Sequence, residues 1–239
     1  MKHKATRFYI DVRLHGYSKN YAKSLIFDIS KKFHVKGATR GKVVPHITLY
    51  GPATTHDIRR VVSIVQSIGQ KYTLVPFKIK GFDYFPNHSK VIFLDIDPSP
   101  ELKNLRWELS EALQKISTCQ PFDKTREFNF HSTIAFKDIN RKFERIQHYI
   151  KQEEPDIKQY LLRITILGHR SRILYEYDII LKKLLNRNEA LSRRWLKKTF
   201  KELNRLRGLS TESPRPLLSR LSNSIQCLWL SLVKKHHHH

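Results

Sequence analysis

The stretch Pro45-His46-Ile47-Thr48-Leu49-Tyr50-Gly51 places a histidine two residues before a threonine inside a short apolar run. Such a run predicts a β-strand, in which successive side chains point to opposite faces of the sheet. His46, Thr48 and Tyr50 are therefore expected on one face, with the residues between them in the core. This face of the strand would present an imidazole beside a hydroxyl group.

The same pattern recurs at Phe130-His131-Ser132-Thr133-Ile134-Ala135-Phe136. By the same alternation, His131, Thr133 and Ala135 are expected to share one face. A single His-x-Thr is a weak signal, because a lone histidine in a strand is more often an ordinary core or surface residue. His169-Arg170-Ser171 has similar spacing but follows a glycine turn, and we assign it no role. Two copies in strand context predict a paired site.

The elements around the motifs form one pattern, strand-helix-strand-helix-strand, that is used twice. The first copy runs from a strand at Phe8 to Leu14 to a strand at Phe77 to Phe85. The second copy begins at Lys90 to Asp97 and ends with strands at Tyr160 to Leu167 and Ile173 to Leu181. Helices are expected after the N-cap residues Ser18, Thr54 or Thr55, and Ser99, and over Phe143 to Ile150.

This order of elements predicts an α+β fold. We expect a bilobal, duplicated domain over residues 1–181, with two opposed antiparallel sheets and helices on the outside. The histidine strand occupies the same slot in each copy. The two motifs would then face each other across a cleft.

The composition changes after Leu181. Residues 182–235 contain 14 Lys and Arg against three acidic residues. We expect a basic, helical C-terminal extension, with a first amphipathic helix, a linker at residues 211–216 and a second helical stripe from Leu217 to Leu232. It would either grip an RNA backbone or pack on the domain or on a second subunit. The last four residues, His236 to His239, resemble a purification-tag remnant.

The charge of the chain is its most informative bulk property. The 239 residues include 45 Lys and Arg against 21 Asp and Glu, a formal net charge of +24. This excess favours a polyanionic partner, of which nucleic acid is the usual one, although a generally basic protein is the alternative. No run approaches the roughly 18 apolar residues of a membrane span. Two cysteines and no signal-peptide pattern lead us to expect a cytoplasmic protein.

Two histidines across a cleft predict acid and base catalysis near neutral pH, since imidazole titrates close to 6.5. One, when neutral, takes a proton from an attacking water or hydroxyl group, and the other donates a proton to the departing oxygen. The hydroxyls of Thr48 and Thr133 would hold a phosphate between the imidazoles. The pattern indicates phosphodiester hydrolysis or transesterification with no metal and no cofactor.

Pro45-His46-Ile47-Thr48-Leu49 and His131-Ser132-Thr133-Ile134 resemble the paired signatures of the two-histidine (2H) phosphoesterases, the superfamily of 2′-5′ RNA ligases and cyclic phosphodiesterases. The resemblance covers about residues 7–181. It implies the bilobal fold and a reaction that needs no metal. It also implies that His46 and His131 are the catalytic histidines and that Thr48 and Thr133 bind the phosphate.

Many members of this superfamily open 2′,3′-cyclic phosphates on RNA ends to 2′-phosphates, and others act on 2′-5′ linkages or small cyclic nucleotides. Many place a proline before the second histidine and an arginine five residues after it. Phe130 and Phe136 stand at those positions here, which leaves the substrate open. The candidate RNA contacts are Tyr50, Lys124, Arg126 and Lys137.

Three functions are therefore compatible with the sequence. The first is an RNA 2′,3′-cyclic phosphodiesterase in which His131 activates water and His46 protonates the leaving oxygen. The second is a 2′-5′ RNA ligase or 2′-5′ phosphodiesterase that uses the same site. The third is an RNA-binding module with little turnover. The intact histidines and threonines of both motifs favour an enzyme, a phosphoric diester hydrolase. The sequence leaves the oligomeric state open.

Overall fold

The computed structural model describes residues 5–85, 90–151 and 155–209. The chain divides into two units, Met1–Thr199 and Phe200–His239, and the first unit contains both histidine motifs. The expected turn at residues 86–89, the linker, the second helical stripe and the tag remnant lie outside the described residues.

The strands and helices follow the expected order closely. The strands are β1 (Thr6–Arg13), β2 (His46–Thr55), β3 (Pro76–Phe85), β4 (Val91–Pro98), β5 (His131–Phe136), β6 (Ile157–Tyr160), β7 (Arg163–Leu167), β8 (Ile173–Asp178) and β9 (Lys183–Asn186). The helices are α1 (Gly16–Phe33), α2 (Ile58–Gln70), α3 (Pro100–Gln114), α4 (Phe143–Ile150), α5 (Arg187–Leu191) and α6 (Arg193–Leu206), with short 3₁₀ helices η1 (Pro121–Lys124), η2 (Asn140–Lys142) and η3 (His169–Ser171).

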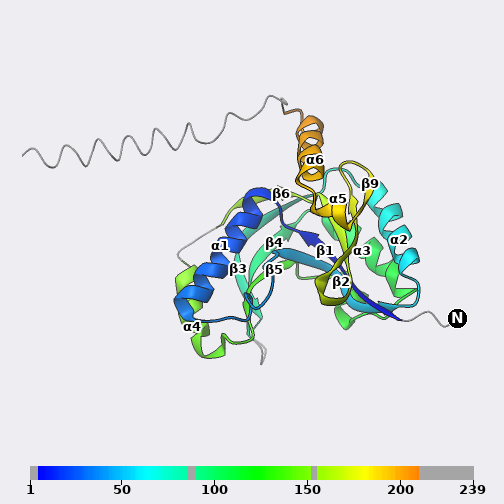
Figure 1. Cartoon of the computed structure of the whole chain (residues 1–239). Coiled ribbons are helices and arrows are strands. Elements are labelled where there is room, and N and C mark those ends of the chain that lie inside the picture. Colours follow the sequence, from blue (N-terminus) through cyan, green and yellow to red (C-terminus); the bar gives the residue numbers. More distant parts are fainter. Residues whose placement is uncertain (1–4, 86–89, 152–154, 210–239) are drawn as a thin grey trace, which may run out of the picture. The chain divides into compact units, whose positions relative to one another are not determined.

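The strands form two antiparallel sheets. One sheet has the order β2-β1-β7-β8-β9 and the other has the order β5-β4-β3-β6. The strands of the second sheet are labelled in Figure 1. This arrangement confirms the predicted α+β fold with two antiparallel sheets. The two histidine strands, β2 and β5, are each at the edge of their own sheet, and they contact each other.

The two copies of the repeated pattern exchange strands. β3 ends the first copy but pairs with β4 of the second, and β7 belongs to the second copy but pairs with β1 of the first. The expected single strand at residues 160–167 is wrong, because Leu161 and Leu162 separate β6 from β7. Both leucines are buried, so the alternation of a strand is lost there. The chain crosses from one sheet to the other at this point.

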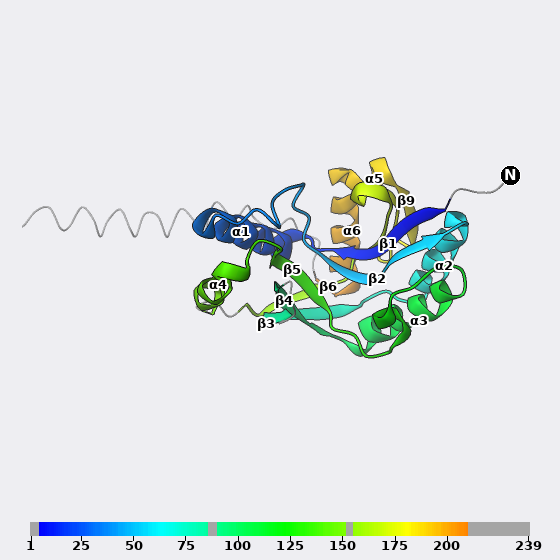
Figure 2. The ribbon, with the colours of Figure 1, turned by 90° about the horizontal axis from the view of Figure 1, so that it is seen from below.

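The helices that precede the histidine strands also cross over. α1 follows β1 but contacts β5, and α3 follows β4 but contacts β2 (Figure 2). Each helix buries one apolar stripe, as its 3.6-residue periodicity predicts. Each histidine strand is thus covered by the helix that leads to the other one. The large apolar residues that are buried are Leu25, Ile26, Ile29 and Phe33 on α1 and Leu102, Leu105, Leu109 and Leu113 on α3.

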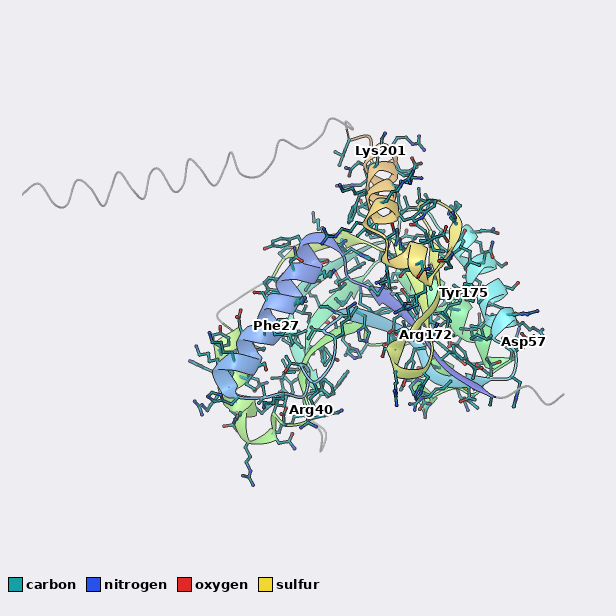
Figure 3. The ribbon with its side chains drawn as sticks, in the orientation of Figure 1. Phe27, Arg40, Asp57, Arg172, Tyr175 and Lys201 are labelled. Carbon is teal, nitrogen blue, oxygen red and sulfur yellow. The ribbon has the colours of Figure 1, made fainter. Side chains whose placement is uncertain are left out.

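One predicted helix start is confirmed and two are wrong. Ser99 caps α3, since its side chain accepts from the N–H of Leu102. α2 is capped by Asp57, labelled in Figure 3, because the expected caps Thr54 and Thr55 belong to β2. α1 begins at Gly16, and Ser18 lies within it.

The domain extends beyond the expected boundary at residue 181. β9 is the fifth strand of its sheet, and the first compact unit ends at Thr199. Leu185 and Ala190 pack with Ile173 in a small core against which Trp195 lies. The basic composition of this segment concealed the few apolar residues that hold it on the sheet. The described part of the extension is therefore partly a piece of the domain.

None of the helices in the described ranges is long and apolar enough to cross a membrane.

Candidate active site

A β-bulge follows the first motif. Thr48 lies opposite Asp11 on β1, whereas Tyr50 lies opposite Ile10, so the strand contains one extra residue between them. Residues that are directly opposite in an antiparallel pair share a face, and neighbours on one strand do not. Tyr50 therefore lies on the face opposite to Thr48, where its ring stacks with Phe8.

The predicted role of Tyr50 is wrong for this reason. Its side chain is fully buried. Its hydroxyl group donates to the carbonyl of Thr118 and lies 3.0 Å from Oγ of Ser117. Tyr50 is a core residue that ties β2 to the segment after α3, and it is not available for contact with RNA.

The second motif has a bulge at the same place. Thr133 lies opposite Phe93 on β4, and Ala135 lies opposite Ile92, again with one extra residue. The expectation that Ala135 shares the face of His131 is therefore wrong as well. In both motifs, only the histidine and the threonine remain on the common face.

Both histidines are fixed in the same way. Nδ1 of His46 is 2.8 Å from the carbonyl oxygen of Val44, and Nδ1 of His131 is 2.9 Å from that of Asn129. In each case the carbonyl belongs to the residue two positions earlier. A neutral imidazole has one N–H group, and a carbonyl oxygen can only accept, so the proton lies on Nδ1. Nε2 of each neutral imidazole then carries the free lone pair.

His46 lies beside a buried carboxylate. Its side chain is 45% exposed, and its Nε2 is 3.7 Å from Oδ2 of Asp11, whose side chain is only 3% exposed. Burial raises the pKa of the Asp11 carboxyl, and the charge of His46 and a hydrogen bond from Thr48 act in the opposite direction. A protonated His46 and an ionised Asp11 would stabilise each other at this distance.

His131 lies among aromatic rings. The centroids of Phe85 and Phe93 are 5.1 and 5.0 Å from that of its imidazole. Burial lowers the pKa of His131, the hydrogen bond to Asn129 acts in the opposite direction, and the charge of His46 lowers it further. β2 and β5, the strands that carry the two imidazoles, contact each other. Burial beside Phe85 and Phe93 therefore favours the neutral form of His131.

The two threonines also differ. The Thr48 side chain hydrogen-bonds the Asp11 carboxyl, whereas Thr133 lies opposite the apolar Phe93. Both are partly exposed. A hydroxyl group has one hydrogen to donate, so the two are unequal as donors to a phosphate.

The other predicted RNA contacts are exposed and stay predictions. Lys124 ends η1, in the loop that leads to β5. Arg126 donates to Oδ1 of Asn104 at 3.0 Å. Lys137 follows β5 and places its ammonium group 5.1 Å from the centroid of the Phe136 ring. A hollow beside this region is lined by Asp95, Ile96 and Glu127 to Phe130.

Sequence reasoning missed the residues that organise the approach to His131. Arg106 on α3 is fully buried, donates to the carbonyls of Phe122 and Thr125, and lies over the ring of Phe128 at 4.1 Å. A buried arginine needs hydrogen-bond partners to be tolerated, and Arg106 has them at both terminal nitrogens, whereas its buried Nε has none in the described part of the chain. The signal in the sequence was an arginine between Leu105 and Leu109 on the apolar stripe of α3.

Within residues 5–85, 90–151 and 155–209, no group of three or more His, Cys, Asp or Glu side chains is arranged to hold a metal ion.

Comparison with solved structures finds similar but distant chains. LigT of E. coli in apo form is 14% identical, with 73% of this chain and 98% of that one covered and a TM-score of 0.45. LigT complexed with 3′-AMP is 15% identical, with 73% and 98% covered and a TM-score of 0.46. Usb1 of Kluyveromyces marxianus with uridine monophosphate is 10% identical, with 77% and 99% covered and a TM-score of 0.45.

A comparison with curated protein sequences found no match. The family model of the 2′-5′ RNA ligase superfamily, in contrast, matches residues 29–172. This match spans more than half of the chain and includes both histidine motifs. The resemblance predicted from those motifs is confirmed, and the chain belongs to the 2′-5′ RNA ligase superfamily.

Proposed function

We propose that this protein is a phosphodiesterase that opens the 2′,3′-cyclic phosphate end of an RNA to a 2′-phosphate, with His46 and His131 as acid and base. Membership of the superfamily supports a phosphoesterase that acts on RNA or nucleotides. The observation that carries the proposal is the matched fixation of the two imidazoles through Nδ1, which leaves both Nε2 atoms for proton transfer.

The environments of the two histidines support the assignment of roles. His131 has a lowered pKa, so it is neutral at pH 7 and its Nε2 can accept a proton. His46 has Oδ2 of the Asp11 carboxylate 3.7 Å from its Nε2, the nitrogen that would donate the proton. Two titratable groups in opposite environments are the usual arrangement for an acid and a base.

The reaction then balances without any other group. Nε2 of His131 takes a proton from water while the water oxygen forms a bond with phosphorus. The bond between phosphorus and O3′ breaks, and O3′ takes the proton from Nε2 of His46. The products are a 2′-phosphate and a 3′-hydroxyl group. The hydroxyls of Thr48 and Thr133 would hold the non-bridging oxygens, where negative charge gathers.

Product analysis tests this proposal. The purified protein is incubated, with chelator, with an RNA that ends in a 2′,3′-cyclic phosphate, and the position of the product phosphate is mapped. A 2′-phosphate is expected. His46→Ala and His131→Ala should each lower turnover by roughly 10²-fold or more, since each removes a proton-transfer partner. The double variant should be little worse, because the two act as a unit.

His169→Ala is the matched control. His169 is exposed and precedes a serine by two residues, as in the motifs, but it lies in the short helix η3 and not on a histidine strand, so turnover should stay at the wild-type level. Normal activity of either active-site variant would contradict the proposal.

Other outcomes identify the alternatives. Formation or cleavage of 2′-5′ linkages would assign the second function, and RNA binding without turnover would assign the third. A rate that collapses with chelator and returns with a divalent cation would contradict metal-free chemistry.

A further inference from the structure

The register of the two sheets identifies a pair of equivalent positions, one occupied by a carboxylate and the other by an aromatic side chain. Thr48 lies opposite Asp11 on β1, and Thr133 lies opposite Phe93 on β4. β1 and β4 are the inner neighbours of the two histidine strands. The repeat thus places a carboxylate opposite Thr48 and a phenyl ring opposite Thr133. Asp95 lies opposite His131, and its carboxylate is engaged by Nζ of Lys80 at 3.3 Å.

Asp11 is poorly compensated by its surroundings. Its side chain is 3% exposed, and within the described part of the chain its buried Oδ1 has no hydrogen-bond partner. Its Oδ2 is 3.7 Å from Nε2 of His46, and Thr48 hydrogen-bonds the carboxyl. A buried carboxylate in this position is costly unless a positive charge lies close to it.

The neighbouring cation on the same strand is already engaged. Arg13 lies opposite His46 in the register, but its guanidinium binds Glu176 of β8 through two hydrogen bonds of 2.9 and 2.8 Å. It also donates to the carbonyl of Ala190. His46 is the titratable group whose charge acts on the Asp11 carboxyl, at 3.7 Å. His131 on β5 interacts in turn with the charge of His46.

We propose that Asp11 is a positioning residue that holds His46 in its protonated form with Nε2–H ready for donation, whereas Phe93 at the equivalent position keeps His131 neutral. This inference rests on the proposed function and assigns the acid to the first motif and the base to the second. It also orients the substrate, because the departing O3′ must lie at His46 and the attacking water at His131.

The first test needs no turnover. The side-chain carboxyl of Asp11 is titrated by NMR and assigned by its loss in Asp11→Asn. His46→Gln, which fills the site without a charge, should raise the pKa of Asp11, because the charge of His46 lowers it. By linkage, the size of this shift is also the effect of Asp11 on the protonation of His46. His131→Gln is the matched control and should leave the titration of Asp11 nearly unchanged.

The second test uses the leaving group. Turnover is measured for an RNA 2′,3′-cyclic phosphate, whose alkoxide needs a proton, and for a p-nitrophenyl ester of a nucleotide, whose leaving group does not. Asp11→Asn should lower kcat for the cyclic phosphate by about 10-fold, with little change in KM and little loss on the aryl ester. His131→Ala should lose activity on both substrates, since both need an activated water.

The outcomes separate this inference from the function on which it rests. An Asp11 titration that does not respond to His46→Gln overturns the inference whether or not the protein is an enzyme. An equal loss of Asp11→Asn on both esters also overturns it, because a merely structural role would lower both. If wild-type protein turns over neither substrate, the proposed function fails, and the titration alone still decides on the Asp11–His46 pair. If Asp11→Asn does not fold, the resonance of Asp11 is assigned from wild-type spectra and the titration proceeds.

Discussion

The carboxylate of Asp123, in the loop that leads to His131, accepts a hydrogen bond from the backbone N–H of Gly51, which follows the His46 motif. The same two segments meet again where Gln120 donates to the carbonyl of Pro52 at 2.8 Å. Gly51 has a φ of +96°, a backbone conformation that residues with a side chain rarely adopt. The segment that follows the His46 motif is thus hydrogen-bonded to the loop that precedes the His131 motif.

The reverse connection exists as well. The backbone N–H groups of Lys36 and Gly37, in the loop that leads to His46, donate to the Asp138 carboxylate, just after β5, at 2.7 and 2.9 Å. A Cβ at Gly37 would lie 1.9 Å from the carbonyl oxygen of Phe136. The loop continues to Arg40, labelled in Figure 3. Burial raises the pKa of Asp138, but the backbone hydrogen bonds from Lys36 and Gly37 and, to a smaller extent, the charge of Arg40 lower it overall. The two motifs are therefore braced reciprocally.

This bracing predicts that Asp138→Ala lowers kcat by about 10-fold or more while changing the Tm little. Asp138 is exposed, so little burial is lost, but the entry to His46 is released, and small displacements of catalytic groups are costly. Cyclic-phosphate turnover and thermal unfolding are measured together. Asp28→Ala, at an exposed position on α1, is the control and should retain wild-type kcat. A variant with normal kcat and only a lower Tm would show that the brace serves stability alone.

The fold was largely predictable because its elements carry strong local signals. The apolar runs around His46 and His131 and the cap at Ser99 depend on neighbouring residues only. The bulges after Thr48 and Thr133 were not predictable, because strict alternation assumes that each residue of a strand pairs with one residue of the neighbouring strand. The burial of Tyr50 depends on that single extra residue.

Long-range pairing accounts for the rest. The exchange of β3 and β7 between the copies is decided by contacts between residues far apart in the sequence, and periodicity carries no information on these contacts. Asp11 was read only as part of the first strand, since its position beside His46 follows from the register of β1 and β2. β9 was missed because four residues among basic neighbours give little pattern.

A second prediction concerns stability at mildly acidic pH. Burial lowers the pKa of His15 well below 6.5, and the charges of Arg13, Arg163 and Lys19 lower it further. The unfolded chain then binds a proton that the folded chain does not, so the free energy of unfolding should fall as the pH drops below about 6.5. One such group contributes a slope of at most about 1.4 kcal/mol per pH unit.

Denaturant unfolding of His15→Gln and the wild type between pH 5 and 8 isolates this contribution. The variant should show a shallower loss of stability below about pH 6.5, the unperturbed value for histidine. The pKa values of Asp11 and Asp123 are raised, so these two carboxyls make the free energy of unfolding fall as the pH rises. Both proteins contain them, so their effect cancels in the comparison. Parallel curves for the two proteins would contradict the role of His15.

A third prediction separates the two threonines. The hydroxyl of Thr48 hydrogen-bonds the Asp11 carboxyl. Thr133 lies opposite the apolar Phe93, so its hydroxyl can donate to the phosphate. Thr133→Val should therefore lower kcat/KM for the cyclic phosphate by about 10-fold or more, as expected for a lost hydrogen bond to a charged group. Thr48→Val should cost less. The two isosteric variants control for each other, and an equal or larger loss in Thr48→Val would contradict the assignment.

A fourth prediction concerns the basic C-terminal segment, residues 182–235. Deletion of the residues after Leu185 would not test whether this segment binds RNA. The carbonyl of Ala190 accepts from Arg13 and Arg163, and the hydroxyl of Thr199 donates to Asp178. Removal of these residues would leave buried charges uncompensated, and the domain would be destabilised whether or not the segment binds RNA. Charge removal by point substitution avoids this.

The exposed residues Arg193, Arg194 and Lys197 begin α6 and are suited to that substitution. If they contact the RNA backbone, replacement of all three by Gln should weaken binding of long RNA and reduce the dependence of log affinity on log salt by about 0.7 for each lost contact with a single strand. Turnover of a dinucleotide-sized cyclic phosphate should hardly change, because the reacting groups are untouched. Replacement of the exposed Lys23, Lys31 and Lys32 on α1 by Gln removes the same three charges and is the control for net charge. An unchanged salt slope in a triple variant that still folds would rule out the RNA-gripping role and leave packing on the sheet as the function of the segment.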